Sequence, residues 1–389
     1  MRDSRRDMGT LLQQRKTSEA GFTLIELLFA AALFVIIGGA AFELFAQHQP
    51  LFNQQQNQAA LNISMRNAIA QMQVDIVNGG AGYYNGINIP SWPVGVVINN
   101  NVVASGGACN TGTTYGANCF DSFTTIVSDP NTTPVNPLAG ASSSLPVTAG
   151  TCASNTTVTS STTSLYVLPP TGVTAATYAA NFYSGDQILL ENSSGSAYTT
   201  TKLTAAGATS VVNGTTYVLL THGLTAVGGT NSSTDDPTGM SVNSPDLTTD
   251  TFCATGWVLR LTPIKYDVDI TTNSANPTLR RTELIQGNTP AGNGVPLANQ
   301  VIGFKIGASL INGTTDIPTY NFDSSTFTSA SSPHGYDYTL VRSVMVSLIG
   351  RTPPNADPTY VFRNLFDGGP YEIQGVSVIV NPRNMSMTD

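Results

Sequence analysis

The chain has 389 residues, of which only 10% are charged, and its formal net charge at pH 7 is −8. Binding to phosphate backbones needs concentrated positive charge, so this composition argues against nucleic acid as a partner. The charged fraction lies far below the roughly 25% of typical soluble domains, so uncharged polar residues must form much of the surface.

The first predicted element is an apolar helix over Phe22–Ala46. Its only polar or charged residues are Thr23, Glu26 and Glu43, and it is long enough to span a membrane. A carboxylate inside such a segment is costly, so Glu26 should lie near the helix end or acquire a partner. Five basic residues precede the segment and predict a cytoplasmic N-terminus: Arg2, Arg5, Arg6, Arg15 and Lys16.

The residues just before the apolar segment indicate how the chain is processed. An ordinary secretory signal has its small cleavage-site residues after the apolar stretch, whereas Ala20 and Gly21 come directly before it here. Together with Phe22 and Glu26, Gly21 makes the sequence resemble the type IV prepilin family. The resemblance implies that a prepilin peptidase cuts after Gly21 and methylates the new amino group of Phe22. The alternative is an uncleaved signal anchor with Glu26 at the headgroup level, and a start at Met8 would only shorten the leader.

Glu26 has an expected role in assembly. After cleavage, the amino group of Phe22 would meet the Glu26 carboxylate of a neighbouring subunit inside a bundle of apolar helices. Buried ion pairs add little net stability but can fix register, which is the hypothesis that we adopt for Glu26.

A second, amphipathic stretch continues the helix. Apolar residues recur at spacings of three and four with polar residues between them: Leu61, Met65, Ala68 or Ile69, Met72 and Ile76. Gly79 and Gly80 follow as a stop signal, which predicts one helix from about Phe22 to Asn78 whose second half packs on a globular domain. Pro50 removes one backbone hydrogen bond, so bending or local melting of the helix is expected near it. Major pilins often carry a helix-breaking proline nearer the position of Glu43, so the resemblance does not fix where a kink would lie.

The composition then changes to Ser, Thr, Asn, Gly and Pro, with short apolar runs that are typical of strands and turns. We expect an α+β protein with a large, mostly antiparallel β-rich head, divided into a leader (1–21), a helix (22–78) and a head (79–389). The head forms either one large sheet structure with insertions or two subdomains, and Thr124–Thr163 is expected to be a poorly packed loop. Nine segments are the strand candidates: Val94–Val103, Ser164–Leu168, Gln187–Leu190, Thr216–Thr221, Trp257–Leu261, Ile264–Ile270, Val301–Ile306, Val341–Ile349 and Gly375–Val380.

The four cysteines all follow the predicted membrane segment, so we expect disulfides in an oxidising compartment: Cys109, Cys119, Cys152 and Cys253. Cys109 and Cys119 bracket a short loop and are the natural local pair, which would leave Cys152 with Cys253. No C-x-x-C spacing occurs, so a zinc site is not expected.

The sequence contains no recognisable catalytic or cofactor-binding motif. His48, His222 and His334 are isolated from any nucleophile motif, and no phosphate-binding glycine motif occurs. We therefore expect no enzyme, no cofactor and no metal, with one alternative, a calcium site formed by neighbouring acidic residues: Asp235, Asp236, Asp246 and Asp250.

Later segments resemble the PilW-like family of type IV pilus minor pilins. They are Leu61–Tyr83, Asn181–Leu190, Pro277–Gly307, Val341–Arg351 and Gly375–Asn384, whereas the Ser/Thr-rich stretches at 104–163 and 223–250 have no counterpart. The resemblance implies a minor pilin that helps to initiate pilus assembly, with its helix first in the inner membrane and its head in the periplasm, and later at the filament tip and cell surface. Its partners would be other minor and major pilins, the peptidase and the membrane. The alternatives are a J-type pseudopilin of type II secretion and a tip adhesin that binds a surface or glycan.

Overall fold

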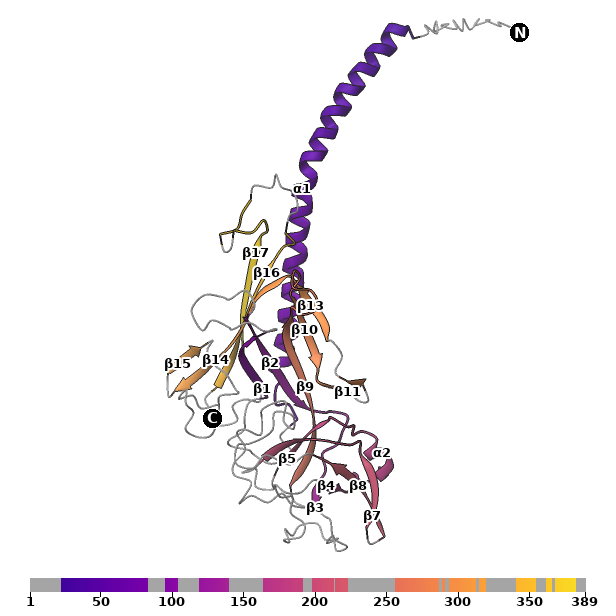
Figure 1. The fold of residues 1–389 in the computed structure, drawn as a ribbon, viewed down its shortest axis with the longest axis vertical. Coiled ribbons are helices and arrows are strands. Elements are labelled where there is room, and N and C mark those ends of the chain that lie inside the picture. The colour runs from indigo at the N-terminus through magenta and orange to yellow at the C-terminus, as the bar shows by residue number, and fades with distance from the viewer. Residues whose placement is uncertain are drawn as a thin grey trace, which may run out of the picture. The chain divides into compact units, whose positions relative to one another are not determined.

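The computed structural model describes residues 22–82, 95–103, 119–139, 164–191, 198–212, 214–222, 256–286, 289–290, 294–312, 315–319, 341–354, 362–365 and 368–382 (Figure 1). The chain divides into two parts, Met1–Gln56 and Asn57–Asp389. Helix α1, Leu24–Val77, begins in the first part and ends in the second, which also holds a β-rich head. The predicted α+β class, with a long N-terminal helix followed by a mostly antiparallel β-rich head, is confirmed.

Helix α1 runs without interruption through Pro50. The predicted helix from about Phe22 to Asn78 is therefore observed almost to its ends, and the helix is not melted at the proline. A proline removes one backbone hydrogen bond and crowds the preceding turn, a local cost that the long helix on either side can absorb. The helix also passes through Gly38 and Gly39, whose surroundings are open.

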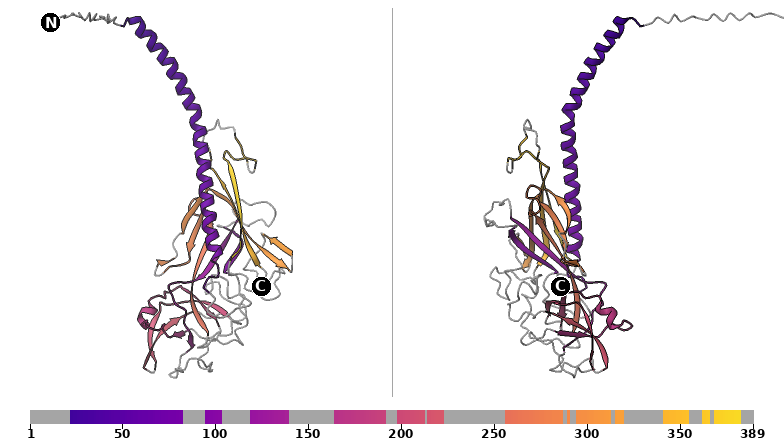
Figure 2. Two further views of the ribbon diagram at one scale, coloured as in Figure 1. Left: turned by 180° about the vertical axis from the view of Figure 1, so that it is seen from behind. Right: turned by 45° about the vertical axis from the view of Figure 1, so that its right-hand side comes forward.

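The second half of α1 packs on the head along the face that its sequence periodicity predicts. Residues Ile63 and Val74 on other faces are exposed, so the burial is one-sided. Figures 1 and 2 both show this end of the helix alongside the strands of the head. All the predicted face residues are buried: Leu61, Met65, Ala68, Ile69, Met72 and Ile76.

A glycine turn ends α1 and attaches it to the sheet. The backbone N–H of Gly79 donates to the carbonyl of Ile76 over 3.0 Å, and Gly80 adopts a φ of 74°, a conformation that favours glycine. The N–H of Gly80 then donates to the carbonyl of Ile126 over 2.8 Å. A Cβ atom on Gly95 would lie 1.8 Å from the Gly80 nitrogen, so this close approach requires a glycine at position 95.

The largest sheet has seven strands, in the order β1-β2-β9-β10-β13, with β5 on β9 and β6 on β5. All of its ladders are antiparallel. Its strands are β1 (Val96–Val103), β2 (Cys119–Ser128), β5 (Gln187–Glu191), β6 (Tyr198–Lys202), β9 (Trp257–Asp269), β10 (Thr278–Glu283) and β13 (Val295–Asn299).

The long strand β9 connects two regions of the head. Its first residues pair with β5, up to Leu261, and β10 takes over from Ile264 onward. Pro263 lies at this change of partner, and its carbonyl accepts from the N–H of Leu284 over 3.0 Å on the β10 side. The proline's missing N–H therefore falls between two partners and breaks no ladder. The prediction of two strands on either side of Pro263 is corrected to one continuous strand.

Two further four-stranded sheets complete the described head. One has the order β15-β14-β16-β17 and the other the order β3-β4-β8-β7, and β11 pairs with β12. A short helix, α2 (Ala175–Ala179), lies between β4 and β5 in sequence. The bounds are β3 (Pro137–Ala139), β4 (Ser164–Val167), β7 (Ala208–Val212), β8 (Thr215–Thr221), β11 (Ile285–Gln286), β12 (Thr289–Pro290), β14 (Val301–Asn312), β15 (Thr315–Thr319), β16 (Val341–Arg351) and β17 (Ile373–Val380).

The head contains two principal hydrophobic clusters joined by β9. The larger one holds the buried face of α1, together with Phe123 and Tyr266, whose rings stack at 4.7 Å, and Phe304. The second holds side chains of α2, β4, β5 and β8 and includes Val258 from the beginning of β9. Both clusters lie within the compact part Asn57–Asp389.

The expectation of a loose loop over Thr124–Thr163 is wrong for its first part. Residues up to Ser128 belong to β2, a strand between β1 and β9, and Pro137–Ala139 forms β3. Thr124 and Thr125 are buried, and the hydroxyl of Thr125 donates to the carbonyl of Ile264 over 3.5 Å. Residues 140–163 lie outside the described residues. Each of the nine predicted strand segments overlaps an observed strand, and two of them, Trp257–Leu261 and Ile264–Ile270, fall in the same strand, β9.

Candidate assembly site

The first turn of α1 holds the Glu26 carboxylate in a capping arrangement. The backbone N–H of Thr23 donates to Oε2 of Glu26 over 2.9 Å, and the Thr23 hydroxyl donates to the same oxygen over 3.0 Å. In return, this hydroxyl accepts from the backbone N–H of Glu26 over 3.3 Å. A Thr and a Glu spaced three residues apart satisfy donors that a helix start leaves unpaired, and the helix dipole favours a negative charge there. The Thr-x-x-Glu spacing was readable in the sequence, but its capping role was missed.

The helix surface that follows is apolar and exposed. Among the described residues, α1 is the helix that is long and apolar enough to cross a membrane. An exposed apolar surface of this length is typical of a segment that lies in lipid or between other apolar helices. The exposed large side chains between positions 22 and 52 are Phe22, Leu24, Ile25, Leu27, Leu28, Phe29, Leu33, Phe34, Val35, Ile36, Ile37, Phe42, Leu44, Phe45, Leu51 and Phe52.

At the other end of α1, Asp75 attaches the helix to the head. Oδ2 of Asp75 accepts from Nε of Arg281 over 2.8 Å and from the hydroxyl of Tyr266, and Nη1 of Arg281 reaches Glu283 over 3.0 Å. Burial, followed by the bond to Asp75, raises the pKa of Tyr266, so this hydroxyl stays a donor at neutral pH. Burial alone would lower the pKa of Arg281, but the bonds to Asp75 and Glu283 outweigh it and raise that pKa.

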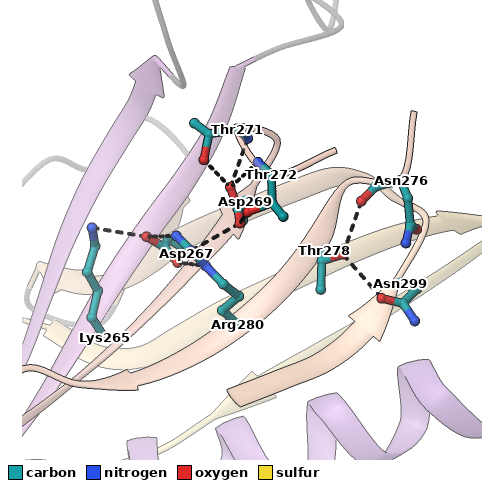
Figure 3. A network of polar contacts seen from close by, with 9 residues as sticks. All are labelled: Lys265, Asp267, Asp269, Thr271, Thr272, Asn276, Thr278, Arg280 and Asn299. Atoms are coloured by element: carbon teal, nitrogen blue, oxygen red, sulfur yellow. Dashed lines mark hydrogen bonds and ion pairs between the residues drawn. The ribbon is translucent and has the colours of Figure 1, made fainter. Parts of the chain in front are cut away.

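A second polar network covers β9 and β10 (Figure 3). Asp267 pairs with Lys265 and with Arg280, each over 3.2 Å, and Arg280 also reaches Asp269 over 3.1 Å. Hydrogen bonds from Thr271 and Thr272 hold the pKa of Asp269 far below its ordinary value. The Asp269 carboxylate accepts from backbone and hydroxyl donors of the turn between the two strands, so these hydrogen bonds fix that turn.

A third ionic cluster joins three segments near the second core. Arg260 on β9 donates to Asp129 and to Asp186, each over 2.6 Å, and both carboxylates are buried. Burial would raise the pKa of Asp129, but hydrogen bonds from Asn131, Thr132 and Arg260 outweigh it and lower that pKa. Since the three charged residues are distant in sequence, sequence reasoning did not pair them.

A fourth contact joins the ends of β14 and β16. Nε of Arg351 donates to Oε1 of Gln300 over 2.8 Å, and its guanidinium lies 4.9 Å from the ring centre of Tyr371. Gln300 adopts a φ of 58°, which is uncommon outside glycine. Its backbone is held there because its N–H donates to Asn276 over 3.1 Å and its carbonyl accepts from the N–H of Arg351 over 2.9 Å.

The other predicted site residues are placed only in part. Phe22 is described and exposed, and Gly21 lies outside the described residues. Of the cysteines, Cys119 is described in its backbone alone, where it pairs with Val103 at the start of β2. Both disulfide pairings stay predictions, because three of the cysteines lie outside the described residues: Cys109, Cys152 and Cys253.

The candidate histidines and acidic residues form no described metal site. His48 is exposed on α1, and His222 is buried beside β8, where it bridges to Leu203. Within the described part of the chain, no three His, Cys, Asp or Glu side chains gather as a metal site. The remaining candidates lie outside the described residues: His334, Asp235, Asp236, Asp246 and Asp250.

Comparison with protein families gives a match in the N-terminal region of the chain. Residues 16–42 match the model of the prokaryotic N-terminal methylation motif, a span that includes Gly21, Phe22 and Glu26. No curated protein matches the chain. Among solved structures, a type IV-like pilin from Thermus thermophilus is similar at 16% identity, covering 32% of this chain and 69% of its own, with a TM-score of 0.18. The chain therefore carries a prepilin-type methylation motif at the start of its apolar helix.

Proposed function

We propose that this chain is a minor pilin of a type IV pilus. One observation carries the proposal: a methylation motif begins an apolar helix that is exposed along its first half and buried in a β-rich head along its second. A prepilin peptidase would cut after Gly21 and methylate Phe22. The apolar half would then hold the subunit in the inner membrane, with the head in the periplasm, until it enters the filament.

Assembly in this proposal exchanges the partner of Glu26. In the single chain the carboxylate accepts from Thr23 and caps its own helix. In an apolar bundle a charged side chain needs an opposite charge nearby, which the α-amino group of Phe22 from a neighbouring subunit supplies. The first turn presents Glu26 close to the end of the helix, where that amino group can reach it. The pair sets the axial position of one subunit against the next.

The role of a minor pilin is supported by the head segments that resemble the PilW-like family. Residues from those segments meet in the head: Asp75 pairs with Arg281, and Gln300 with Arg351. Each pair joins two of the resembling segments, so the residues that resemble the family include ones whose contacts hold the fold together. Such a subunit would act with other minor pilins to initiate assembly, at the tip of a filament built from major pilins.

The proposed role is structural. Five basic side chains of the described head lie in ion pairs with its own carboxylates, which compensates their positive charge and disfavours binding to a nucleic acid. These paired residues are Arg260, Lys265, Arg280, Arg281 and Lys305. No cofactor is required for this role, in which the chemistry belongs to the peptidase.

The test is mass spectrometry of sheared surface filaments, with quantification of the N-terminal peptide against the main subunit. We expect a methylated Phe22 at a low ratio. Gly21→Leu should block cleavage, because a bulky residue replaces the small one at the cut site. Gly39→Leu is the matched control, since a side chain at Gly39 meets open space and should leave processing intact.

Three outcomes would contradict the proposal. Uncut leader peptide confined to the membrane fraction favours an anchored periplasmic protein. A processed subunit that co-purifies with secretion pseudopilins and is absent from pili favours the J-type pseudopilin. Lost adhesion with a normal number of pili, after deletion of one Ser/Thr-rich stretch of the head, favours the tip adhesin.

A further inference from the structure

Among the described residues, no strand pairs with the outer edge of β17, which presents a row of backbone groups there. It is the last strand in the order β15-β14-β16-β17 and pairs with β16 along its whole length (Figure 1). The N–H of Thr352 donates to the carbonyl of Glu372 over 2.9 Å, which fixes the phase of the ladder. Alternate residues of an antiparallel strand point to the same neighbour, so every second residue of β17 directs its N–H and C=O outward. These residues are Ile373, Gly375, Ser377 and Ile379.

Most other outer strands of the described sheets carry features that discourage pairing with a further strand. Proline occurs in β3, β13 and β15, a bulge interrupts both β1 and the β10–β13 ladder, and β6 ends in Lys202. Strand β17 has no proline, no charged residue and no register shift over eight residues. Strand β7 shares these properties but has only five residues. Since exposed edges are usually protected against pairing, β17 is the exception that calls for an occupant.

The exposed face of the strand itself is uncharged and partly apolar. Ile379 is 68% exposed, and Gly375 and Ser377 on the same face are exposed as well. At the start of the strand, Leu365 is fully exposed beside an open groove of about 480 Å³. The groove is lined by Phe362, Arg363, Asn364, Leu365, Glu372 and Ile373.

The position of β17 in the head restricts the occupant. Gly350, which pairs with Gln374, approaches so closely that a Cβ on it would lie 2.9 Å from Leu61. The strand therefore begins at the end of the head where α1 enters. If a second copy added its own β17 in antiparallel fashion, the two chains would enter their heads from opposite ends. A shared membrane or filament requires the same direction, so an antiparallel partner cannot be the β17 strand of a second copy. The other unprotected outer strand, β7, has five residues and could pair with only part of β17, so the described strands of a second copy offer no full-length match.

We propose that β17 pairs antiparallel with an uncharged edge strand in the head of a different pilin subunit. This inference rests on the proposed function, which brings other pilin heads alongside this one. This chain carries a net charge of −8, and the uncharged strand offers a place where another head can approach without meeting charged side chains of the strand itself. Backbone hydrogen bonds along β17 would give affinity, and partner side chains against Leu365 at its start and Ile379 near its end would give selectivity.

The experiment places a photo-cross-linking amino acid at Ile379 of the full chain, in cells that assemble pili. Val295, which is 63% exposed on β13 next to Pro296, is the matched control position. Ser377→Pro removes the outward N–H and the side-chain hydroxyl but keeps every backbone hydrogen bond to β16, so it blocks the edge. Ser377→Ala keeps that N–H and loses only the hydroxyl contact with Ser347 at 3.0 Å.

We expect an adduct with one other pilin from position 379 and none from position 295. Ser377→Pro should reduce the adduct about tenfold, as expected for a lost ladder bond and a steric block, whereas Ser377→Ala should not. If Ser377→Pro does not fold, the adduct is tested in Ser377→Lys, which adds a protective charge without changing the backbone. Its loss there supports the proposal equally.

An adduct that persists in the blocked variants, or that contains a second copy of this chain, overturns the proposal. The absence of any adduct, while Phe22 is methylated and the subunit is in filaments, also overturns it but leaves the proposed function standing. An unprocessed subunit that never reaches filaments overturns the proposed function itself.

Discussion

Removing the Asp75 carboxylate should loosen the attachment between α1 and the head. In Asp75→Ala the Tyr266 hydroxyl and the Arg281 guanidinium lose a shared acceptor. Both donors are positioned by strands, β9 and β10, that cannot follow the shortened side chain. The helix end would then depend on its apolar contacts, chiefly those of Met72 and Ile76.

The expected loss in the free energy of unfolding depends on the contacts that Arg281 keeps. Breaking a buried ion pair costs about 3–5 kcal/mol, and a lost hydrogen bond to a charged group about 1.5–3 kcal/mol. Arg281 keeps its contact with Glu283 over 3.0 Å, and its side chain remains 21% exposed to water. We therefore expect a loss near the lower end, about 3 kcal/mol in the free energy of unfolding.

Urea unfolding of the full chain in detergent measures this loss through tryptophan fluorescence, to which Trp257 at the start of β9 contributes as one of two tryptophans. Asp267→Ala is the comparison variant. The Asp267 side chain is 20% exposed against 11% for Asp75, so water compensates more of what its pairs with Lys265 and Arg280 lose, and the variant should cost less, about 1 kcal/mol. The double variant Asp75→Ala/Arg281→Ala should lose less than the sum of the single variants. A loss in Asp75→Ala no greater than that of Asp267→Ala would refute the reasoning.

Three further predictions concern assembly, acid stability and packing. Glu26→Ala should insert and be cleaved but enter filaments poorly, because the amino group of Phe22 loses its partner; normal incorporation in filament mass spectrometry contradicts this. The pKa of Asp269 is lower in the folded chain than in the unfolded one, so its contribution is present above about pH 4 and is lost as the pH falls through the folded pKa. Urea midpoints of Asp269→Asn should accordingly depend less on pH in acid than those of the unaltered chain. Gly350→Val should cost about 1–3 kcal/mol in urea unfolding, since its Cβ would lie 2.8 Å from Met65, whereas Gly375→Val meets open space and should cost little.

The sequence predicted the elements whose pattern is local. The spacing of Leu61, Met65 and Met72 identified the buried face of α1, because a helix brings every third and fourth residue to one side. Alternating and continuous apolar runs located the strand segments, because a strand turns every second residue to the same face. Pro263 misled the reading of β9, since a proline usually ends a strand, and only the change of partner from β5 to β10 makes it harmless.

Composition misled the reading where burial depends on distant partners. Thr124 and Thr125 suit a loop by residue type, yet β9 and β1 enclose them on both sides as part of β2. The ion pairs were missed for a related reason. Asp129, Asp186 and Arg260 come together only through the strand order, which no local pattern carries.

The two ends of α1 hold carboxylates with opposite consequences. Within the described part of the chain, the Glu26 carboxylate accepts from Thr23 alone, on an exposed turn, an arrangement that can be exchanged for a stronger partner at little cost. Asp75 is held by two side chains of the sheet and cannot exchange without loosening the head. Variants at these positions should therefore separate two phenotypes. Changes at Glu26 should leave the urea stability of the head unaltered while reducing incorporation, and changes at Asp75 should lower stability while leaving cleavage after Gly21 intact.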